Sequence, residues 1–333
     1  MTRLGERQYV RPGSRLEPKA FCTQAKVLVV AGKGGVGKST VAAALAQMAA
    51  SAGLRALIVE VEGTNSLGPM FGTADVLTYR EVVLGEGKDG GEVRARTLTP
   101  DDALIEYLHD HGMRRISKRL VATGTLDVVA TAVPGIKDIL VLGKVKQLER
   151  AAAAGVDGAP DLIVVDAPAA GHAVQFLASA SGLLDAVAVG PIRSQAVDVV
   201  ELLRDPARCQ VILVTLPEET PVNEVTETAF HLEDRAGVQL TPVIVNAVFP
   251  PLELADALTV GAGQLPGADL ATLAAAAAFR RRRQELQAAQ LERLAELLPL
   301  PRMRLPFLFT TEIGPPEIAT LADALAAEIR DLP

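Results

Sequence analysis

Glycines and lysines are concentrated in residues 32–40, which read Gly-Lys-Gly-Gly-Val-Gly-Lys-Ser-Thr. The apolar, β-branched run Lys26–Ala31 precedes this stretch and predicts a buried strand, while apolar residues at helical spacing follow it over Ser39–Ala52. Glycines let successive backbone N–H groups curve around an anion, and the start of a helix adds positive potential. The pattern G-x-x-x-x-G-K-[ST], placed between a strand and a helix, therefore predicts a loop that binds the phosphates of a nucleotide.

The side chains of this loop have distinct expected roles. Lys38 is expected to reach the β- and γ-phosphates, and the Ser39 hydroxyl is expected to ligate Mg²⁺. The expected nucleotide-binding residues of the loop are Gly32, Lys33, Gly34, Gly35, Val36, Gly37, Lys38, Ser39 and Thr40. The alternative is a glycine turn that only joins a strand to a helix, and the lysine and serine in their required positions argue against it.

Lys33, directly after the first glycine, makes the loop more specific. The pattern K-G-G-x-G-K-[ST] resembles the deviant Walker A loop of the P-loop ATPase family that contains ArsA, MinD, ParA and the nitrogenase iron protein. This resemblance implies that the nucleotide is ATP, that the protein works as a dimer, and that Lys33 is a catalytic residue reaching the partner's nucleotide. Charge neutralisation in a water-poor interface is worth far more than in water. The alternative is a solvated surface lysine.

Later segments narrow the resemblance to the ArsA/Get branch, the arsenite-pump and tail-anchored-protein-targeting ATPases. The segment Asp166–His172 (DAPAAGH) is similar to the branch's second switch, which implies that Asp166 is a catalytic residue and holds Mg²⁺ together with Ser39. The segments Leu57–Gly63 (LIVEVEG) and Pro134–Asp138 (PGIKD) look most like the paired ArsA-like ATPases of actinobacteria.

Two residues in the C-terminal half resemble the branch's contacts to adenine. Asn246 ends the apolar run in VIVNAVFP, where the branch uses an asparagine amide to read the base. A strand-end asparagine that caps a turn fits the sequence equally well. Pro306 lies in Leu305–Pro316 (LPFLFTTEIGPP), which resembles the loop on the adenine side.

The first switch departs from the branch. Where the branch has an aspartate that positions the attacking water, alignment on Phe71 puts Glu62, whose carboxylate is one methylene further out. A misplacement of roughly 1 Å in a positioning group can cost on the order of a hundredfold in rate. We therefore expect an ATP-binding, slowly hydrolysing dimeric switch that handles a client or partner protein, with Glu62 as its catalytic carboxylate. The alternatives are a catalytically weak regulatory or structural subunit of a heterodimer with an ArsA-like paralogue and, less favoured, a MinD/ParA-type organising ATPase.

Thiolate and histidine metal sites are not expected. The two cysteines, Cys22 and Cys209, match neither three arsenite thiolates nor a C-x-x-C zinc clamp nor the paired thiolates of an iron–sulfur cluster. The four histidines do not cluster in the sequence: His109 and His111 flank a helix turn without a third ligand. The expected cofactors are therefore ATP and Mg²⁺, with no zinc and no iron–sulfur cluster.

The apolar runs predict an α/β fold. Strands are expected at Lys26–Ala31, Arg55–Val61, Asp161–Val165, Ala186–Val189, Gln210–Thr215 and Pro242–Asn246. Their alternation with helical stretches predicts a mainly parallel sheet with helices on both faces. We expect a flexible arm over residues 1–24, a single ATPase domain over 25–333, a helical insertion over about 100–154 and a long helix over Ala268–Leu298.

The helical insertion lies where the ArsA/Get branch builds a groove for hydrophobic clients. Its apolar residues at helical spacing are Ile136, Ile139, Leu140, Val141, Val145 and Leu148. They either line an exposed groove for a protein client or pack onto the domain's own core, and packing is favoured. The run Arg280–Arg283 either binds an anionic partner or forms a solvated helix face, and the solvated face is favoured.

The composition and charge of the chain limit the classes of partner that are expected. The chain has 333 residues with 33 basic and 40 acidic side chains, a formal charge of −7. This acidic balance argues against work on nucleic acid or anionic lipid, and 3% aromatic residues suit base stacking poorly. No run of about 18 uncharged apolar residues occurs, so no transmembrane segment is expected. We expect a cytoplasmic homodimer, or a heterodimer with an ArsA-like paralogue.

Overall fold

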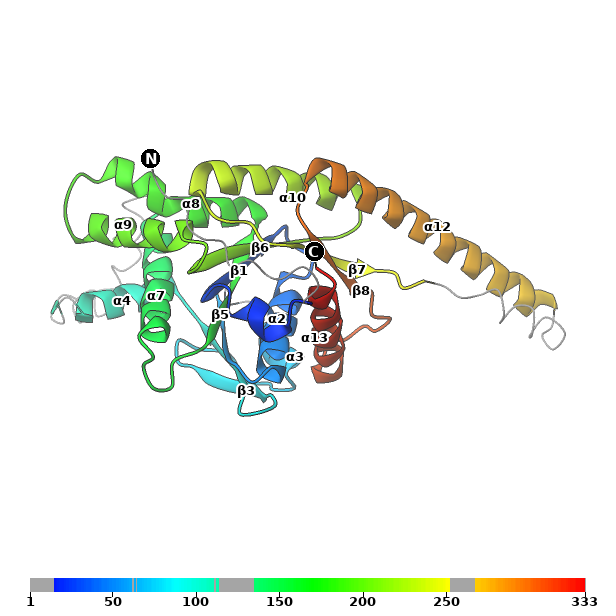
Figure 1. Ribbon diagram of the computed structural model, residues 1–333, viewed down its shortest axis with the longest axis horizontal. Coiled ribbons are helices and arrows are strands. Elements are labelled where there is room, and N and C mark those ends of the chain that lie inside the picture. The colour runs from blue at the N-terminus through cyan, green and yellow to red at the C-terminus, as the bar shows by residue number, and fades with distance from the viewer. Residues whose placement is uncertain are drawn as a thin grey trace.

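The centre of the molecule is a twisted sheet. The computed structural model describes residues 15–61, 63, 65–110, 112–113, 135–251 and 267–332. In the described part, eight strands are ordered β3-β4-β2-β5-β1-β6-β7-β8. The sheet that they form lies between the helices (Figure 1). They are β1 (Val27–Gly32), β2 (Arg55–Glu60), β3 (Val82–Glu86), β4 (Glu92–Thr97), β5 (Leu162–Ala169), β6 (Cys209–Thr215), β7 (Val243–Val248) and β8 (Arg302–Pro306). Neighbouring strands are parallel except β3, which is antiparallel to β4. The predicted α/β class is confirmed.

Helices cover both faces of this sheet. They are α1 (Pro18–Cys22), α2 (Lys38–Ser51), α3 (Leu67–Met70), α4 (Pro100–Asp110), α7 (Ile136–Ala153), α8 (Ala170–Ala186), α9 (Pro191–Arg204), α10 (Glu219–His231), the π-helical turn η1 (Leu232–Ala236), α12 (Gly267–Leu297) and α13 (Pro315–Arg330). Alternate residues of β1 enter different cores: Leu28 and Val30 pack with α2 and α13, whereas Val27 and Val29 pack with α7, α8 and α9. A strand buried on both faces explains the unbroken apolar run in the sequence.

One predicted strand is wrong. Residues Ala186–Val189 do not form a strand, because α8 extends to Ala186 and Val187 is its C-cap. Val189 is 83% exposed, so this apolar run is not a strand buried on both faces. The structure adds β3, β4 and β8, which the sequence analysis did not predict, and all three lie toward the two ends of the strand order.

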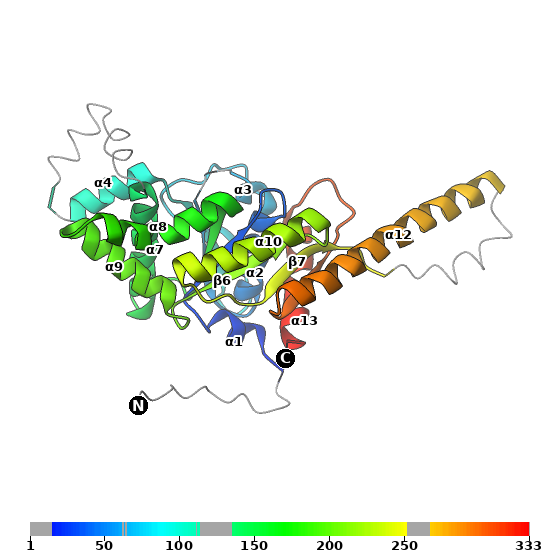
Figure 2. The ribbon, with the colours of Figure 1, turned by 90° about the horizontal axis from the view of Figure 1, so that it is seen from above.

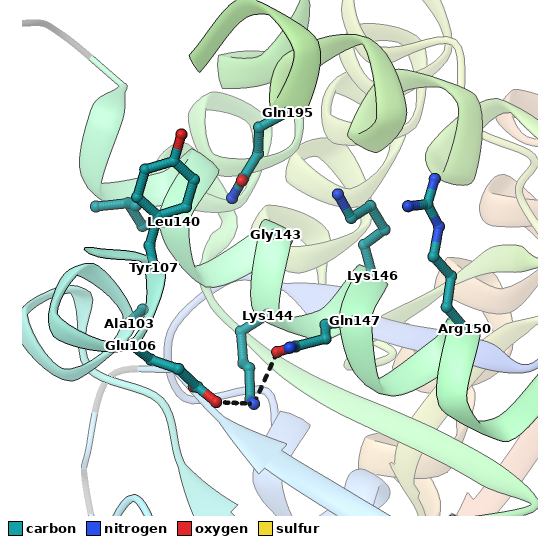
Figure 3. A pocket seen from close by; sticks show the side chains of 10 residues that line it. All are labelled: Ala103, Glu106, Tyr107, Leu140, Gly143, Lys144, Lys146, Gln147, Arg150 and Gln195. Atoms are coloured by element: carbon teal, nitrogen blue, oxygen red, sulfur yellow. Dashed lines mark hydrogen bonds and ion pairs between the residues drawn. The ribbon is translucent and has the colours of Figure 1, made fainter. Parts of the chain in front are cut away.

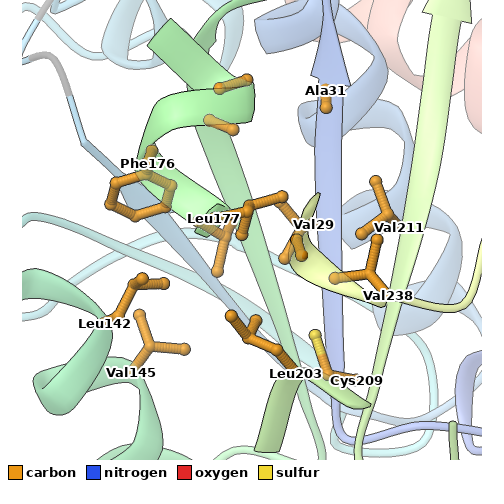
Figure 4. Close-up of a cluster of buried hydrophobic side chains, with 14 of the residues drawn as sticks. Val29, Ala31, Leu142, Val145, Phe176, Leu177, Leu203, Cys209, Val211 and Val238 are labelled. Carbon is orange, nitrogen blue, oxygen red and sulfur yellow. The ribbon is translucent and has the colours of Figure 1, made fainter. Parts of the chain in front are cut away.

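The helical insertion packs against the body of the protein. Ile139, Val141 and Val145 of α7 are buried in the core shared with α8 and α9. Figure 4 shows side chains of α7 beside Phe176 and Leu177 of α8. The favoured packing interpretation therefore holds for these residues, while residues 114–134 of the expected insertion lie outside the described part.

The N-terminal end of the described chain is anchored to the body of the protein. Helix α1 lies within residues 1–24, which were expected to form a flexible arm, yet Phe21 and Cys22 are buried in the core that includes α2 and α13.

The expected long helix is α12, whose N-terminal half projects from the body (Figure 2). In its arginine run, Arg281 and Arg282 are exposed. Among the helices of the described residues, none is long and apolar enough to cross a membrane.

Candidate nucleotide site

Close packing around the loop between β1 and α2 explains its glycines. A Cβ at Gly32 would lie 2.4 Å from the carbonyl oxygen of Val214, because β1 and β6 are adjacent at this point. Gly37 is the N-cap of α2 with φ of +90°, and a Cβ there would lie 2.3 Å from Nδ2 of Asn246. Any side chain at these positions would clash or be strained, so the loop keeps its backbone N–H groups accessible only with glycine.

The first two residues of α2 are Lys38 and Ser39, the residues predicted to bind phosphate and Mg²⁺. The ammonium of Lys38 donates a hydrogen bond to the carbonyl oxygen of Lys33 at 3.3 Å, so it folds back over the loop. The hydroxyl of Ser39 donates to Oδ2 of Asp166 at 2.6 Å. Asp166 comes from β5, which pairs directly with β1, and is only 6% exposed. The topology therefore brings together the two predicted Mg²⁺ ligands from positions 127 residues apart.

A hydroxyl beside a carboxylate fits Mg²⁺. This ion prefers oxygen ligands, takes few of them from protein and keeps waters or phosphate oxygens in its other positions. In the described part of the chain, no three His, Cys, Asp or Glu residues gather as a protein-only metal site. The pair Ser39–Asp166 would therefore hold Mg²⁺ with the help of the nucleotide. Burial raises the pKa of the Cys22 and Cys209 thiols to about 12.

Lys33 points to a different partner. Its ammonium forms an ion pair with Glu224 of α10, and the two side chains are 47% and 29% exposed. A hollow of about 520 Å³ adjoins this pair. It is lined by residues of the loop, α8, α10 and η1, including Gln175, Glu227 and His231. The lysine is thus held within its own chain by a carboxylate at the mouth of the site.

Asn246 supports the loop from β7, which β6 separates from β1 in the sheet. Its Nδ2 donates to the carbonyl oxygen of Val36 at 3.0 Å, and its Oδ1 accepts from the backbone N–H of Ala247 at 2.9 Å. The structure thus shows the turn-capping contacts of this amide. Pro306 ends β8 in register with Val248 of β7, so both residues predicted to contact adenine lie at the same sheet edge as the loop.

An aromatic cluster adjoins this edge. The rings of Phe249 and Phe307 lie 4.9 Å apart, as do those of Phe307 and Phe309. The guanidinium of Arg280, on α12, lies 4.7 Å from the centre of the Phe309 ring. The sequence analysis did not single out these phenylalanines.

Glu60 is a buried carboxylate that the sequence analysis did not name among the site residues. It ends β2, is 1% exposed and accepts a hydrogen bond from the Thr97 hydroxyl at 3.0 Å. The sequence analysis instead favoured Glu62, which lies outside the described residues. The register pairs Glu60 with Asp166 on β5. An acid that ends an otherwise apolar strand was the signal that could have identified it.

Two motifs that carried the resemblance meet at the starts of α7 and α8. Asp138 is in the first turn of α7, and burial raises the pKa of its carboxyl, an effect that the charge of His172 on α8 partly offsets. Asp138 of the insertion and His172 of the second switch therefore lie close enough to interact electrostatically.

A second hollow, of about 200 Å³, lies among α4, α7 and α9 (Figure 3). Lys144 pairs with Glu106 of α4 at 2.7 Å, and Lys146 pairs with Asp198 of α9 at 3.0 Å. Burial alone would raise the pKa of Glu106, but hydrogen bonds from Lys144 and Tyr79 outweigh it and lower that pKa. These charges are matched within the protein and tie α7 to its neighbours.

The residues that form this site lie within a region that is similar to a known protein family. The family model for "Anion-transporting ATPase" matches residues 25–189, which include the loop, Asp166 and both motifs at α7 and α8. The chain is 34% identical over 300 residues to "ATPase BagA" of Mycobacterium tuberculosis, covering 84% of this chain and 86% of that relative.

More distant relatives are longer. Identity is 27% to an "Arsenical pump-driving ATPase" of Escherichia coli and 25% to a "Putative arsenical pump-driving ATPase" of Halobacterium salinarum. The matches cover 69% and 68% of this chain, but only 40% and 36% of those relatives. The phosphate loop followed by a helix, the Ser39–Asp166 pair and the extended match to BagA lead to one assignment: the chain belongs to the anion-transporting ATPase family, the ArsA-like P-loop ATPases.

Proposed function

We propose that this protein is an ATP-binding, slowly hydrolysing dimeric switch of the cytoplasm that couples nucleotide state to the handling of a partner protein. The observation that carries the proposal is the hydrogen bond of 2.6 Å between Ser39 and Asp166 beside a loop whose Lys38 folds over it. That arrangement offers donors for phosphates and oxygen ligands for Mg²⁺ in one place.

In this proposal the roles divide by position. Backbone N–H groups of residues 32–40 and Lys38 bind the phosphates, and Ser39 and Asp166 hold Mg²⁺. Bound Mg²⁺ would neutralise charge on the phosphates during transfer. Asn246 and Pro306 contact adenine, for which Asn246 exchanges its hydrogen bond to the loop for one to the base.

Lys33 acts across the dimer in the proposed mechanism. Its position after the first glycine puts it at the mouth of the site, and its 47% exposure leaves it accessible to a second subunit. A cation delivered to a transition state in trans is worth about 10³-fold or more in rate in related phosphoryl-transfer sites. Glu62 is the carboxylate that orients water, and its extra methylene makes turnover slow.

Three variants test the proposal by calorimetry with Mg²⁺-ATP and by sedimentation. Lys38→Ala should abolish binding, whereas Lys33→Ala should bind ATP nearly as wild type but lose ATP-dependent dimerisation. Glu62→Gln should bind ATP normally and hydrolyse it more slowly. Retention of affinity within a few-fold in Lys38→Ala would refute the phosphate-loop assignment, and loss of binding with intact dimerisation in Lys33→Ala would refute the trans role.

A regulatory subunit is the second candidate function. The substitution of the usual aspartate by Glu62 supports it, because weak water positioning suits a subunit that binds ATP without turning it over. Turnover of the chain alone, and then mixed with an ArsA-like paralogue from the same cell, separates the two candidates. Activity only in the mixture, unchanged by Glu62→Gln in this chain, favours the regulatory subunit.

A further inference from the structure

A bulge interrupts β7 at Asn246 and Ala247. The register between β7 and β8 shifts between Val245 and Val248, so the regular pairing of the two strands is broken at this point. Ala247 has a φ of +59°, in the left-handed region that residues other than glycine avoid because their Cβ crowds the backbone. Such a conformation persists only where the surrounding structure holds it, and bulges beside functional sites often redirect a side chain.

Gln287 of α12 holds this bulge. Its Nε2 donates a hydrogen bond to the carbonyl oxygen of Ala247 at 3.1 Å, and its Oε1 accepts one from the backbone N–H of Phe249 at 2.8 Å. The side chain is only 6% exposed, although glutamine is mostly an exposed residue. Both ends of a buried amide are thus bonded to the backbone of the bulge. An apolar residue at position 287 would remove both bonds and allow Ala247 to relax toward negative φ.

The hydrogen bonds continue from the bulge to the phosphate loop. The N–H of Ala247 donates to Oδ1 of Asn246 at 2.9 Å, and Nδ2 of Asn246 donates to the carbonyl oxygen of Val36 at 3.0 Å. A Cβ at Gly37 would lie 2.3 Å from the same Nδ2, so the amide packs tightly against the start of α2. The orientation of the Asn246 amide therefore depends on the conformation of Ala247, which Gln287 holds from α12.

We propose that Gln287 is a positioning residue of the nucleotide site, which holds the bulge at Ala247 and thereby aims the amide of Asn246 at the nucleotide base. An amide recognises adenine through a donor and an acceptor in one plane, so a small change in its aim weakens both bonds. The inference rests on the proposed function, because it requires that Asn246 exchanges its bond to the loop for one to adenine. Gln287 itself contacts neither the base nor the phosphates and acts through the backbone of β7.

The test compares Gln287→Leu with a matched control and a rescue. Gln287→Leu keeps a side chain of similar size and removes both hydrogen bonds. The control is Gln290→Leu, one turn along the same helix, where the side-chain oxygen accepts a hydrogen bond from Arg293 at 3.4 Å. The rescue adds Ala247→Gly to Gln287→Leu, because glycine adopts positive φ without steric cost. Calorimetry measures the dissociation constants of Mg²⁺-ATP and of Mg²⁺-tripolyphosphate, which has the phosphates but no base, and thermal unfolding checks that each variant is folded.

We expect Gln287→Leu to bind ATP about 5- to 30-fold more weakly, which corresponds to the 1–2 kcal/mol needed to return alanine to the left-handed conformation at 1.36 kcal/mol per factor of ten. Its affinity for tripolyphosphate should equal that of wild type, because the phosphate loop is unchanged. Gln290→Leu should stay within about twofold of wild type for both ligands, as substitutions away from a site usually do. Ala247→Gly in the Gln287→Leu background should recover most of the lost ATP affinity.

Each other outcome overturns the inference. If Gln287→Leu binds ATP as wild type does, Gln287 does not position Asn246; if tripolyphosphate binding weakens equally, Gln287 supports the loop or the packing and not the base contact. If Ala247→Gly recovers nothing, the effect does not pass through the bulge. Should wild type bind neither ligand, the proposed function itself fails, whereas equal affinity for ATP and tripolyphosphate removes only its base contact; the inference falls in both cases. Should Gln287→Leu not fold, Gln287→Glu keeps the acceptor for Phe249 and loses the donor to Ala247, and an ATP affinity equal to that of wild type refutes the role.

Discussion

Replacing Glu224 by glutamine should release Lys33. In the structure this carboxylate forms an ion pair with the Lys33 ammonium, so it competes with any phosphate that the lysine is to reach in a second subunit. Glutamine keeps the size of the side chain and removes the charge that holds the lysine. We expect the ATP-dependent dimer of Glu224→Gln to be tighter than that of wild type.

The exposure of the pair sets the size of the effect. With side chains 47% and 29% exposed, it is close to a surface ion pair, worth about 0.2–1 kcal/mol. A homodimer releases two such pairs, together about 0.4–2 kcal/mol, and because 1.36 kcal/mol is tenfold, the dimer dissociation constant should fall by about 2- to 30-fold. High salt should reduce the difference, since exposed charges are screened.

Sedimentation velocity with a non-hydrolysable ATP analogue and Mg²⁺ measures this constant. The matched control is Glu227→Gln, which removes the same charge from the same hollow one turn along α10. In a Lys33→Ala background the effect of Glu224→Gln should disappear. If Glu227→Gln tightens the dimer equally, or if the effect survives without Lys33, the charge of the hollow and not the ion pair is responsible, and the reasoning is wrong.

Three further perturbations follow from contacts elsewhere. Gly37→Ala should lower ATP affinity at least about tenfold while the protein still folds. Alanine at φ of +90° costs about 1–2 kcal/mol, and its Cβ would displace the side chain of Asn246. An ATP dissociation constant within twofold of wild type, measured by calorimetry, would contradict this. Glu149→Gln should reduce the free energy of unfolding, measured in urea, by about 2–3 kcal/mol, because it breaks a bidentate ion pair between the buried Glu149 and Arg208. Arg208 is partly exposed, which keeps the loss below the usual 3–5 kcal/mol for a buried pair. A loss under about 1 kcal/mol would show that the pair contributes little to stability. Burial would raise the pKa of Asp161, but hydrogen bonds from Arg55 at the start of β2 outweigh it and hold that pKa below 3.8. The ionised carboxylate therefore stabilises the fold above this pH, and the stabilisation is lost as the pH falls through the folded-state pKa. The free energy of unfolding of Asp161→Asn should accordingly depend less on pH below 4 than that of wild type.

Continuous apolar runs predicted the middle of the sheet but not its ends. The strands β1 and β5 are buried on both faces, so their sequences are apolar except for Asp166 in β5, and they were readily recognised. In β4 (EVRART) and β8 (RMRLP) apolar residues alternate with arginines, because these strands bury one face more than the other. A search for unbroken apolar runs misses such strands, and it also accepts the exposed end of α8 as one.

For the site, the local sequence predicted individual residues, whereas the order and register of the strands determine which of these residues lie together. The loop, Lys38 and Ser39 are consecutive, so their motif is legible. Glu60 was not named among the site residues, and only the register between β2 and β5 shows that it lies beside Asp166. Likewise no pattern near Lys33 indicates Glu224, because the two lie 191 residues apart.

Helix α10 connects the mouth of the site to α12. One of its carboxylates, Glu224, holds Lys33, and Glu218 just before its first turn pairs with Arg283 of α12 at 3.2 Å. The second pair is exposed and therefore weak, so α10 and α12 are held together mainly by packing, in which Leu294 of α12 shares the core with Val222 of α10.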